Sequence, residues 1–575
     1  MSETPQNARP GLRLWPGILI VAVTLAVSFG FARFGSTNIQ SGIGNMATPT
    51  IGFIVLLLWW LVGSRAAWVD RFAGLGVLAV CAGAVISSQA TNYYGFIHLT
   101  AVMPVLGAGF VLTLLITSLF APRAQRIATF FVVLAITGFG LAHRVNTVNG
   151  DFTPEFSWRW EENTVVVAET TPYKDINGTA NVPAAAGPKD WPAFRGPERD
   201  GTARGITFST DWAVNPPKQL WKRAVGAGHS SVAVVGDYLF TQEQAGPQEV
   251  VACYNALTGE PVWTRSVTTH HHDDMGGDGP RATPTVADGR VYAQSAGGMF
   301  QCFNAADGSL LWKQDLTTPE DPKPPMYGFS SSALRVNDLL LQFSSGAGRR
   351  SLIAFNPATG ADVWVAAKDT GGYSSPHFAT IAGVPQVLML DSKGLQGFDP
   401  ATGAMLWEHA WQQKKFPRCT QPYLTGDGGI ILGANTDFGT RRVNVGKTDT
   451  GWDVKEAWTN PKHRPYFNDN VGHKGFYYGY DGNRLGCLDL ATGEGKWEGT
   501  RYGGQVMLVE AMDMLLVLTE KGKVALVKAD PAAFTEVAIV DAITGKTWNH
   551  PAIANGKLYV RNSQEMACFE LPQAK

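Results

Sequence analysis

The chain has few charged residues and almost no net charge. Of its 575 residues, 17% are Asp, Glu, Lys or Arg, and the formal net charge is −1. A protein that holds nucleic acid through its phosphates needs a surplus of basic side chains. The composition therefore argues against a nucleic-acid partner.

Cysteine is also scarce, with six residues in the chain. Four of them occupy one equivalent position in the repeats described below, where other repeats have Ala354 or Gly397: these four are Cys253, Cys302, Cys487 and Cys568. A position shared by Cys, Ala and Gly is a small packing site, and equivalent positions in separate repeats lie too far apart to bridge. We expect no disulfide framework, and Cys419 is the one thiol that we single out for a functional role.

Long apolar runs are absent after residue 141 but dominate before it. The runs are Leu14 to Phe31, Gly44 to Ser64, Phe72 to Ala90, Thr100 to Phe120 and Ile127 to Leu141. Each approaches the ~20 residues that a helix needs to cross the hydrocarbon core of a membrane. A cleaved signal peptide is the alternative for the first run, but no small-x-small cleavage site follows it. We predict five transmembrane helices.

Basic residues occur in alternate loops of this half. They precede the first run, follow the second and follow the fourth, whereas the loops at 37–40 and 91–97 carry no charge. The positive-inside rule places the N-terminus in the cytoplasm and everything after Leu141 on the other side of the membrane. No run contains a central Asp, Glu or Lys, which argues against transport by the helices alone.

A turn followed by a tryptophan recurs in the second half. In five copies a Gly follows an Asn or Asp by four residues and a Trp follows it by eight; the copies begin at Asn255, Asn304, Asn356, Asp399 and Asp489. An Asn or Asp side chain can bond the backbone two residues on, and Gly supplies the left-handed position that closes a hairpin. Repeats of roughly 40 to 50 residues built from short strands predict a β-propeller.

The tryptophan spacing predicts eight blades. Trp221 comes too early to end a blade of its own, so we expect its strand to complete the last blade beside a C-terminal strand at Glu565 to Leu571. A blade without the Trp fits between Met507 and Ile539. We therefore expect a membrane domain at 1–143, a linker at 144–189 and an all-β eight-bladed propeller at 190–575.

The residues just before each innermost strand should ring one mouth of the central channel, and they are unusually polar. Arg281, Arg418 and Arg501 would suit a ligand with several carboxylates, while Asp469 and Asn468 offer oxygen atoms that calcium accepts. The other candidates are His229, Tyr327, Ser331, Tyr373, Ser374, Gln421, Tyr502, Asn549 and His550. The alternative is that these residues satisfy one another around a plugged channel.

A run of three histidines and two aspartates, His270 to Asp274, lies in a Gly-rich loop before Arg281. It has the residue types of a metal site. Adjacent histidines in a loop rarely converge on one ion, because metal sites draw ligands from separated positions. We favour a solvated flap over the mouth and leave the metal ligands unknown.

The A/G/C-x-[ND]-x-x-T-G-x-x-x-W pattern resembles that of the pyrroloquinoline-quinone (PQQ) propeller superfamily, and so does the entry Trp191-Pro192-Ala193-Phe194-Arg195-Gly196. Five helices before an eight-bladed propeller also resemble the membrane-bound quinoprotein glucose dehydrogenase. The resemblance implies a bacterial inner-membrane protein with its propeller in the periplasm. It departs from the family in lacking the adjacent cysteine pair of the soluble alcohol dehydrogenases and any C-x-x-C-H haem site.

The resemblance leaves two functions open, and with them whether the chain is an enzyme. In a quinoprotein dehydrogenase acting on an alcohol or sugar, PQQ and Ca²⁺ would lie at the mouth, with the three arginines on the PQQ carboxylates and Asp469 as metal ligand or catalytic base. The helices would pass electrons to membrane quinone, with Tyr93, Tyr94 and His98 beside it or simply at the membrane interface. The other function is a cofactor-free scaffold or binding module for an envelope protein, anchored in the cytoplasmic membrane.

Overall fold

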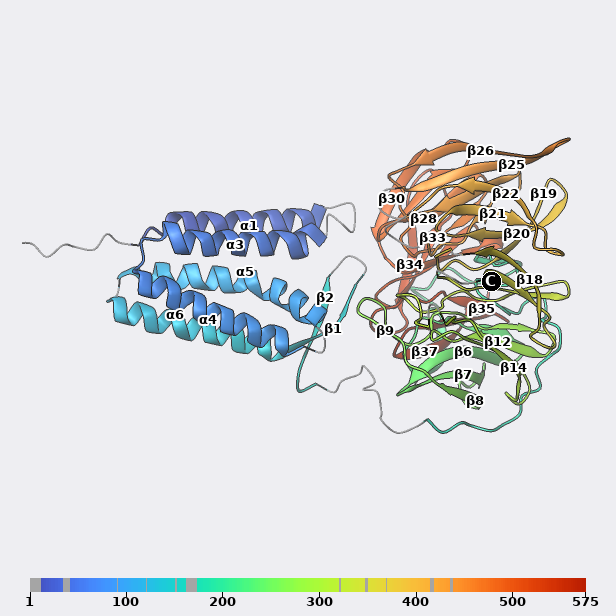
Figure 1. Cartoon of the computed structure of the whole chain (residues 1–575), viewed down its shortest axis with the longest axis horizontal. Coiled ribbons are helices and arrows are strands. Elements are labelled where there is room, and N and C mark those ends of the chain that lie inside the picture. Colours follow the sequence, from blue (N-terminus) through green and yellow to red (C-terminus); the bar gives the residue numbers. More distant parts are fainter. Residues whose placement is uncertain are drawn as a thin grey trace, which may run out of the picture. The chain divides into compact units, whose positions relative to one another are not determined.

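The computed structural model describes residues 12–34, 42–89, 92–119, 121–149, 153–161, 173–319, 322–346, 350–368, 370–413, 418–434 and 438–574. The chain divides into two compact units, 1–162 and 163–575 (Figure 1). The uncharged loop at 37–40 and the central part of the expected linker, 162–172, lie outside the described residues.

The first unit is a bundle of apolar helices. They are α1 (Trp15–Phe34), α3 (Thr48–Leu58) between the π-helical turns Ile43–Ala47 and Trp59–Gly63, α4 (Trp68–Ser87), α5 (Asn92–Ile116) and α6 (Pro122–Leu141), with a 3₁₀ turn at Thr117–Leu119. Four of these helical stretches are long and apolar enough to cross a membrane, and 15–31 is a shorter apolar helix. A membrane anchor is therefore supported by length and composition.

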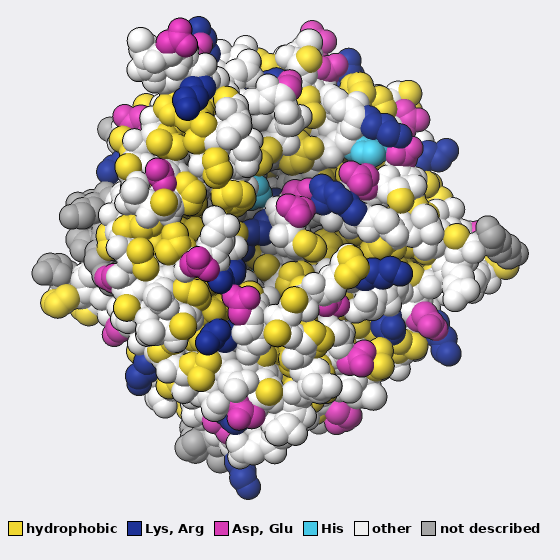
Figure 2. Space-filling model, turned by 90° about the vertical axis from the view of Figure 1, so that its right-hand side faces the viewer, with side chains coloured by type: hydrophobic (Ala, Val, Ile, Leu, Met, Phe, Trp, Pro, Cys, Tyr) yellow, Lys and Arg dark blue, Asp and Glu magenta, His cyan; other side chains and the backbone are white. Residues whose placement is uncertain are grey.

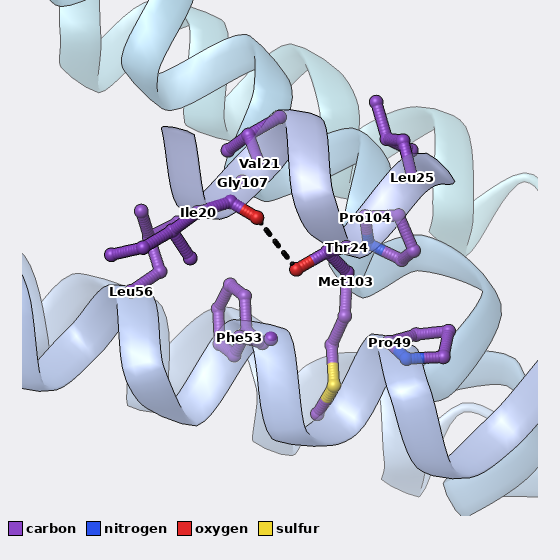
Figure 3. A pocket seen from close by; sticks show the side chains of 11 residues that line it. Ile20, Val21, Thr24, Leu25, Pro49, Phe53, Leu56, Met103, Pro104 and Gly107 are labelled. Atoms are coloured by element: carbon purple, nitrogen blue, oxygen red, sulfur yellow. Dashed lines mark hydrogen bonds between the residues drawn. The ribbon is translucent and has the colours of Figure 1, made fainter. Parts of the chain in front are cut away.

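A narrow apolar crevice lies between α1, α3 and α5 (Figure 3). Its lining includes Phe53, Met103 and Pro104, and its one hydroxyl, that of Thr24, donates to the carbonyl of Ile20 at 2.8 Å. The crevice thus offers contact surface for hydrocarbon, with its polar atom already bonded within the helix.

The segment expected to be a linker is partly regular. A hairpin of β1 (His143–Val148) and β2 (Pro154–Trp158) follows α6. Residues from 173 onward run along the edge of the propeller, where Thr264 N donates to Ile176 O at 3.0 Å and Ala180 N to Ala306 O at 2.7 Å. The polar composition that suggested a linker reflects a segment exposed on the surface. Its backbone groups nevertheless bond to the edge of a sheet.

The second unit is an eight-bladed propeller, as expected (Figure 1). The first four blades are β5 (Ala233–Val235), β6 (Tyr238–Ala245), β7 (Gln248–Asn255), β8 (Pro261–Thr268); β11 (Thr285–Ala287), β12 (Arg290–Gln294), β13 (Met299–Asn304), β14 (Leu310–Asp315); β15 (Leu334–Val336), β16 (Leu339–Phe343), β17 (Arg350–Phe355), β18 (Asp362–Lys368); and β19 (His377–Ile381), β20 (Val384–Leu390), β21 (Gly394–Phe398), β22 (Met405–Ala410).

The fifth to seventh blades are β23 (Tyr423–Leu424), β24 (Gly429–Gly433), β25 (Thr440–Thr448), β26 (Gly451–Asn460); β27 (Val471–His473), β28 (Phe476–Asp481), β29 (Arg484–Asp489), β30 (Gly495–Arg501); and β31 (Gln505–Val509), β32 (Met514–Leu518), β33 (Lys523–Lys528), β34 (Glu536–Asp541). The eighth joins β35 (Ala552–Ala554), β36 (Lys557–Arg561) and β37 (Glu565–Glu570) to β4 (Lys218–Ala224). Trp221 lies opposite Cys568 in that pair, which confirms that the two ends of the propeller close the ring.

The repeated turn has the side-chain hydrogen bonds and the glycine conformation that its sequence predicts. Asn255 Oδ1 accepts the backbone N–H groups of Leu257 and Thr258 at 2.9 and 3.0 Å. Gly259 then adopts φ +75°, a left-handed conformation that glycine reaches without a Cβ clash. The same bonds recur at Asn356, Asp399 and Asp489.

Each turn also receives a tryptophan from the preceding blade. Trp312 Nε1 donates to Pro357 O at 3.0 Å, and its ring lies so close to Gly360 that a Cβ there would sit 2.6 Å from the indole. Trp221, Trp263, Trp364, Trp458 and Trp497 donate in the same way to a carbonyl of the following blade. Trp407 differs: it donates to Gln386 in its own blade, because the fifth blade lacks the repeated turn.

Candidate functional site

Two of the residues nominated at the mouth, Gln421 and Asp469, belong to a belt of hydrogen bonds that ties the blades together. In successive blades, the backbone N–H before the innermost strand donates to the side chain at the equivalent position of the next blade. The links are Ser231 N to Thr283 Oγ1, Thr283 N to Ser332 Oγ, Ser332 N to Ser375 Oγ, Ser375 N to Gln421 Oε1, Gln421 N to Asp469 Oδ1 and Asp469 N to Gln505 Oε1, at 2.6–3.2 Å. Gln505 Nε2 donates to Trp548 O at 3.2 Å.

A second set of candidates reinforces this belt through side-chain donors. Ser374 Oγ donates to Thr420 O at 2.8 Å, Asn549 Nδ2 donates to Ser230 O at 2.8 Å, and Asn468 Nδ2 donates to Gly504 O. Each bond crosses from one blade to the next. Ser331 is buried beside them and its carbonyl accepts Gln342 Nε2 at 3.0 Å. The polar character of these positions thus follows from the need to join eight sheets at their narrowest point.

The entry segment, residues 190–203, crosses one end of the channel and closes it. Trp191 pairs with Val234 of the first blade, and Pro192 O accepts the N–H of Val286 in the second. Its last residues form β3 (Thr202–Ala203), which pairs parallel with β31 of the seventh blade. We call this segment the plug.

Two arginines of the plug reach into the channel from left-handed backbone conformations, with φ of 61° at Arg195 and 57° at Arg199. Such conformations cost an L-residue on the order of 1 kcal/mol. Arg195 Nη2 donates to Asn470 O at 2.6 Å, and Arg199 donates to Ala333 O and Ser332 O at 2.8 and 3.1 Å. Neither arginine was among the candidates from the sequence. The sequence feature that could have indicated them was the entry motif Trp191 to Gly196, which contains Arg195.

Asp469 lies in this buried cluster. Its Oδ1 is 3.5 Å from Arg195 Nη1, its Oδ2 is 3.2 Å from His550 Nε2, and 2% of the side chain is exposed. Burial alone would raise the pKa of Asp469, but Arg195, His550 and the N–H of Gln421 together lower it. Burial lowers the pKa of His550 despite Asp469. In this arrangement Asp469 is an ionised link between blades and plug, and its catalytic role stays a prediction.

The histidine-rich loop covers the other end, as a flap. Its short strands β9 (His272–Asp273) and β10 (Gly277–Asp278) pair, and its tip contacts three separate blades. His229 Nε2 lies 2.7 Å from Gly276 O, Lys546 Nζ donates to Met275 O at 2.5 Å, and Tyr327 Oη is 3.9 Å from Met275 Sδ. No group of three or more His, Cys, Asp or Glu side chains in the described residues is arranged to hold a metal ion.

The three nominated arginines have separate surroundings. Arg281 pairs with Asp273 within the flap and also donates to Gly277 O at 2.7 Å. Arg418 stacks over Trp411 with its guanidinium 4.5 Å from the ring centroid, and burial lowers its pKa to about 10. Arg501 ends β30, the outermost strand of its blade, opposite Arg484.

The nominated aromatic residues divide between mouth and periphery. Tyr327 and Tyr373 form an edge-to-face pair with ring centroids 5.4 Å apart, and Tyr327 N donates to Tyr373 Oη at 3.2 Å. His229 packs against Trp548, centroid to centroid at 5.3 Å. Tyr502 instead donates to Glu536 of the outermost strand in the seventh blade.

Cys419 keeps some accessible surface, but burial and Asp469 raise its pKa to about 12. Its thiol is therefore protonated at neutral pH, and a protonated thiol is a poor nucleophile.

Sequence comparison matches part of this propeller to a known family. Residues 212–387 match the family described as outer membrane protein assembly factor BamB. The matched residues lie within the propeller and reach from its first blade into its fourth. No curated protein sequence matches the chain.

Solved structures similar to this chain share little sequence with it. BamB from Moraxella catarrhalis is 15% identical, with a TM-score of 0.45, over 62% of this chain and 99% of its own. The quinohemoprotein alcohol dehydrogenase ADHIIG from Pseudomonas putida HK5 is 13% identical, with a TM-score of 0.43, over 69% and 84%. A europium-containing methanol dehydrogenase is 11% identical, with a TM-score of 0.42, over 67% and 98%.

Two of the residues nominated to hold PQQ and calcium, Arg281 and Asp469, are already paired within the chain. A ligand with several carboxylates needs guanidinium groups that are free to pair with it, and Arg281 is already paired with Asp273. The carboxylate of Asp469 faces Arg195 and His550, and the flap tip lies across the mouth. Binding would require the flap to move and the Arg281–Asp273 pair to break.

Proposed function

We propose that this protein is a membrane-anchored PQQ-like propeller that works as a cofactor-free scaffold or binding module of the cell envelope. One observation carries the proposal: both ends of the channel are occupied by the chain itself, the plug at one end and the flap at the other. A propeller closed in this way offers its rim and outer faces to a partner. The partner would be another envelope protein.

The outer surface has the mixed character of a protein-binding face. Figure 2 shows one face, on which acidic and basic side chains are interspersed with hydrophobic ones. Large hydrophobic side chains are exposed at the propeller surface, among them Met326 (70%) and Val214 (80%). Single exposed apolar side chains also occur on ordinary protein surfaces, so these two positions are tested directly below.

We further propose an inner-membrane location in a bacterium, with the N-terminus in the cytoplasm and the propeller in the periplasm. The basic loops on one side of the apolar helices support this orientation. Alkaline phosphatase fused after Lys575 should be active, and green fluorescent protein at the same site should be dark. The reverse pattern would contradict the orientation.

The decisive test of the scaffold role is cofactor uptake. Full-length protein in detergent is titrated with PQQ and CaCl₂, while tryptophan fluorescence reports binding and dye reduction over an alcohol and sugar panel reports turnover. We expect neither at micromolar PQQ. Uptake that Arg281→Ala abolishes would overturn the proposal.

A positive test uses a photo-crosslinking amino acid at exposed Met326 or Val214 in living cells. We expect a discrete adduct with an envelope protein from at least one position. The matched control is the same amino acid at Val363, 50% exposed on an outermost strand. Equal, diffuse labelling from all three positions would count against a defined binding surface.

A quinoprotein-type dehydrogenase is the second candidate function, with electrons passing to membrane quinone. Arg418 supports it, because its Nε and Nη1 have no hydrogen-bond partner among the described residues although the side chain is buried. A carboxylate of PQQ could pair with these groups once the flap is displaced. If so, the titration above should show uptake that depends on Arg418 as well as on Arg281.

A further inference from the structure

The outer edge of the first blade is covered by a segment of the chain itself. Residues 173–182 run along β8, the outermost strand of that blade (Figure 1). Thr264 N in β8 donates to Ile176 O at 3.0 Å, and Ile176 N donates to Thr264 Oγ1 at 2.8 Å. The segment then reaches the second blade, where Ala180 N donates to Ala306 O at 2.7 Å. β8 thus has the backbone partner that an edge strand otherwise lacks.

This segment approaches β8 closely and needs a glycine to do so. A Cβ on Gly178 would sit 2.3 Å from Val262 O, so any other residue at that position would collide with the strand. Two residues later, Ala180 is buried in the core cluster against which Val262 packs. A backbone hydrogen bond, a glycine contact and a small apolar contact therefore hold the segment on the edge.

The outermost strand of the second blade, β14, has the same register as β8. Both strands carry a bulge next to their tryptophan, so Lys313 has the place of Thr264 and Leu311 has the place of Val262. In an antiparallel strand the register decides on which side each N–H lies. The N–H of Lys313 therefore points away from its own blade, as that of Thr264 does.

The second contact of the segment also has an equivalent one blade further on. Ala306 lies two residues after Asn304 in the repeated turn, and Ala358 lies two residues after Asn356 in the next copy of that turn. Ala358 is exposed. We call the surface formed by Leu311, Lys313 and Ala358 the open edge.

The open edge is exposed where the edge of the first blade is covered. Leu310 and Leu311 are 48% and 46% exposed and Lys313 is exposed, whereas Thr264 is fully buried. In the part of the chain that the structure describes, no backbone hydrogen bond joins Lys313 N to a segment outside its blade. Adjacent exposed leucines on a strand with a free edge favour pairing with another chain.

The next two blades offer this surface less completely. In the third blade Val365, which has the place of Lys313, packs against the core. In the fourth, β22 contacts the following blade, where Arg441 Nη1 lies 3.2 Å from His409 Nε2. β14 also begins four residues after Ala306, so the open edge continues the interface that residues 173–182 already form.

We propose that β14 binds an extended segment of a partner protein by strand addition, in the way that β8 binds residues 173–182. A carbonyl of the partner accepts Lys313 N, and one of its N–H groups donates to Ala358 O. The partner carries a glycine where its backbone meets Leu311 O and a small apolar residue that covers Leu311. Main-chain bonds of this kind supply affinity, and the side-chain positions supply specificity.

The inference rests on the binding-module function proposed above and adds the kind of partner that the propeller takes. The probe is a fluorescein-labelled peptide with the sequence of residues 173–182, titrated against the full-length protein in detergent. Fluorescence anisotropy reports binding. No PQQ is present, so the result does not depend on whether the mouth takes up a cofactor.

We expect saturable binding of this peptide. The same peptide with Gly178→Val should bind at least tenfold more weakly, because its extra side chain meets the strand carbonyl. No saturable binding, or equal affinity of the two peptides, would overturn the proposal.

Protein variants locate the binding to β14. Lys313→Pro removes the outward N–H and leaves the hydrogen bonds inside the blade, so the Tm should hold while peptide binding is lost. The matched control is Ile539→Pro, because Ile539 has the equivalent place in β34 of the seventh blade and is 42% exposed. It should bind the peptide as the native chain does. Equal affinities of the two variants, high or low, would overturn the proposal.

A second pair of variants serves if Lys313→Pro does not fold. Leu311→Glu places a charge where the apolar contact forms and should weaken peptide binding several-fold. Its control is Val363→Glu, since Val363 has the equivalent place in β18 and is 50% exposed. Unchanged affinity in Leu311→Glu would mean that the peptide binds elsewhere, for example by displacing residues 173–182 from β8, and would overturn the proposal.

Discussion

The two ends of the propeller channel are closed by segments of opposite character. The plug is buried, pairs with innermost strands at both of its ends and places two arginines on backbone carbonyls of distant blades. The flap is a pair of two-residue strands whose His270 and His272 side chains are 41% and 39% exposed. Segments with few buried contacts open at low free energy, whereas buried and paired ones open only with the whole domain. The plug is thus joined to the ring by strand pairing, whereas the flap is joined to it through contacts at its tip, with His271 and Asp273 buried.

The largest effect should come from breaking the plug. Arg195→Met leaves the buried carboxylate of Asp469 facing a neutral imidazole, and removing one partner of a buried ion pair costs roughly 3–5 kcal/mol. We expect a large fall in the Tm of the propeller. The control is Arg204→Met, whose arginine is 46% exposed and pairs with Asp200. Similar shifts in the two variants would mean that the buried pair is unimportant.

Acid should lower the stability of the propeller through buried histidines at both ends of the channel. Burial lowers the pKa of His377 to about 4 and that of His229 to about 3, so an unfolded chain takes up their protons first as pH falls below about 6.5. Each histidine whose pKa is lowered in the folded protein therefore reduces the free energy of unfolding as pH falls. The loss is at most about 1.4 kcal/mol per pH unit, between about pH 6.5 and the pKa in the folded state.

Glu249 changes stability in the opposite direction with pH. Burial raises its pKa to about 7, so its contribution to the free energy of unfolding is lost as pH rises toward that value. The Tm between pH 7.5 and 5.0 should depend less on pH in His377→Gln than in the native chain. His229→Gln should reduce the dependence on pH in the same direction, because burial also lowers the pKa of His229. A steeper dependence of Tm on pH in His377→Gln than in the native chain would contradict this prediction.

The belt lies between the two ends and should show an intermediate effect. Ser332→Ala leaves the buried N–H of Thr283 without its acceptor, at a cost of about 1–3 kcal/mol. Ser309→Ala is the control, because that serine lies in an exposed turn and its hydroxyl bonds to Asp307. We expect a lower Tm for Ser332→Ala and no measurable change for Ser309→Ala.

The smallest effect belongs to the flap. His272 Nδ1 lies 2.8 Å from Asp278 Oδ1, and an exposed pair of this kind contributes about 0–1 kcal/mol. His272→Ala should leave the Tm unchanged within about a degree while amide hydrogen exchange at 270–280 becomes faster. Faster exchange at Trp191 or Arg195 in this variant would show that the two ends are coupled.

The propeller could be predicted because its signals are local. An Asn or Asp, a Gly four residues on and a Trp eight residues on define one hairpin, and the spacing of such hairpins counts the blades. The same reasoning anticipated that β4 would close the eighth blade, since Trp221 had no blade of its own. The candidate site was harder to predict. Gln421 and Asp469 lie just before innermost strands, but their backbone N–H groups bond to side chains of the next blade, 48 and 36 residues away in the chain.

What the sequence determined by itself was the repeat: eight sheets, the turn within each and the apolar helices ahead of them, because each depends on residues a few positions apart. The tertiary structure decided what the polar residues near the axis do. Arg199 meets Ala333 across 134 residues and Arg195 meets Asn470 across 275. Residue spacing in the sequence does not predict such contacts, because they form only when the ring closes and brings the plug and all eight blades to one axis.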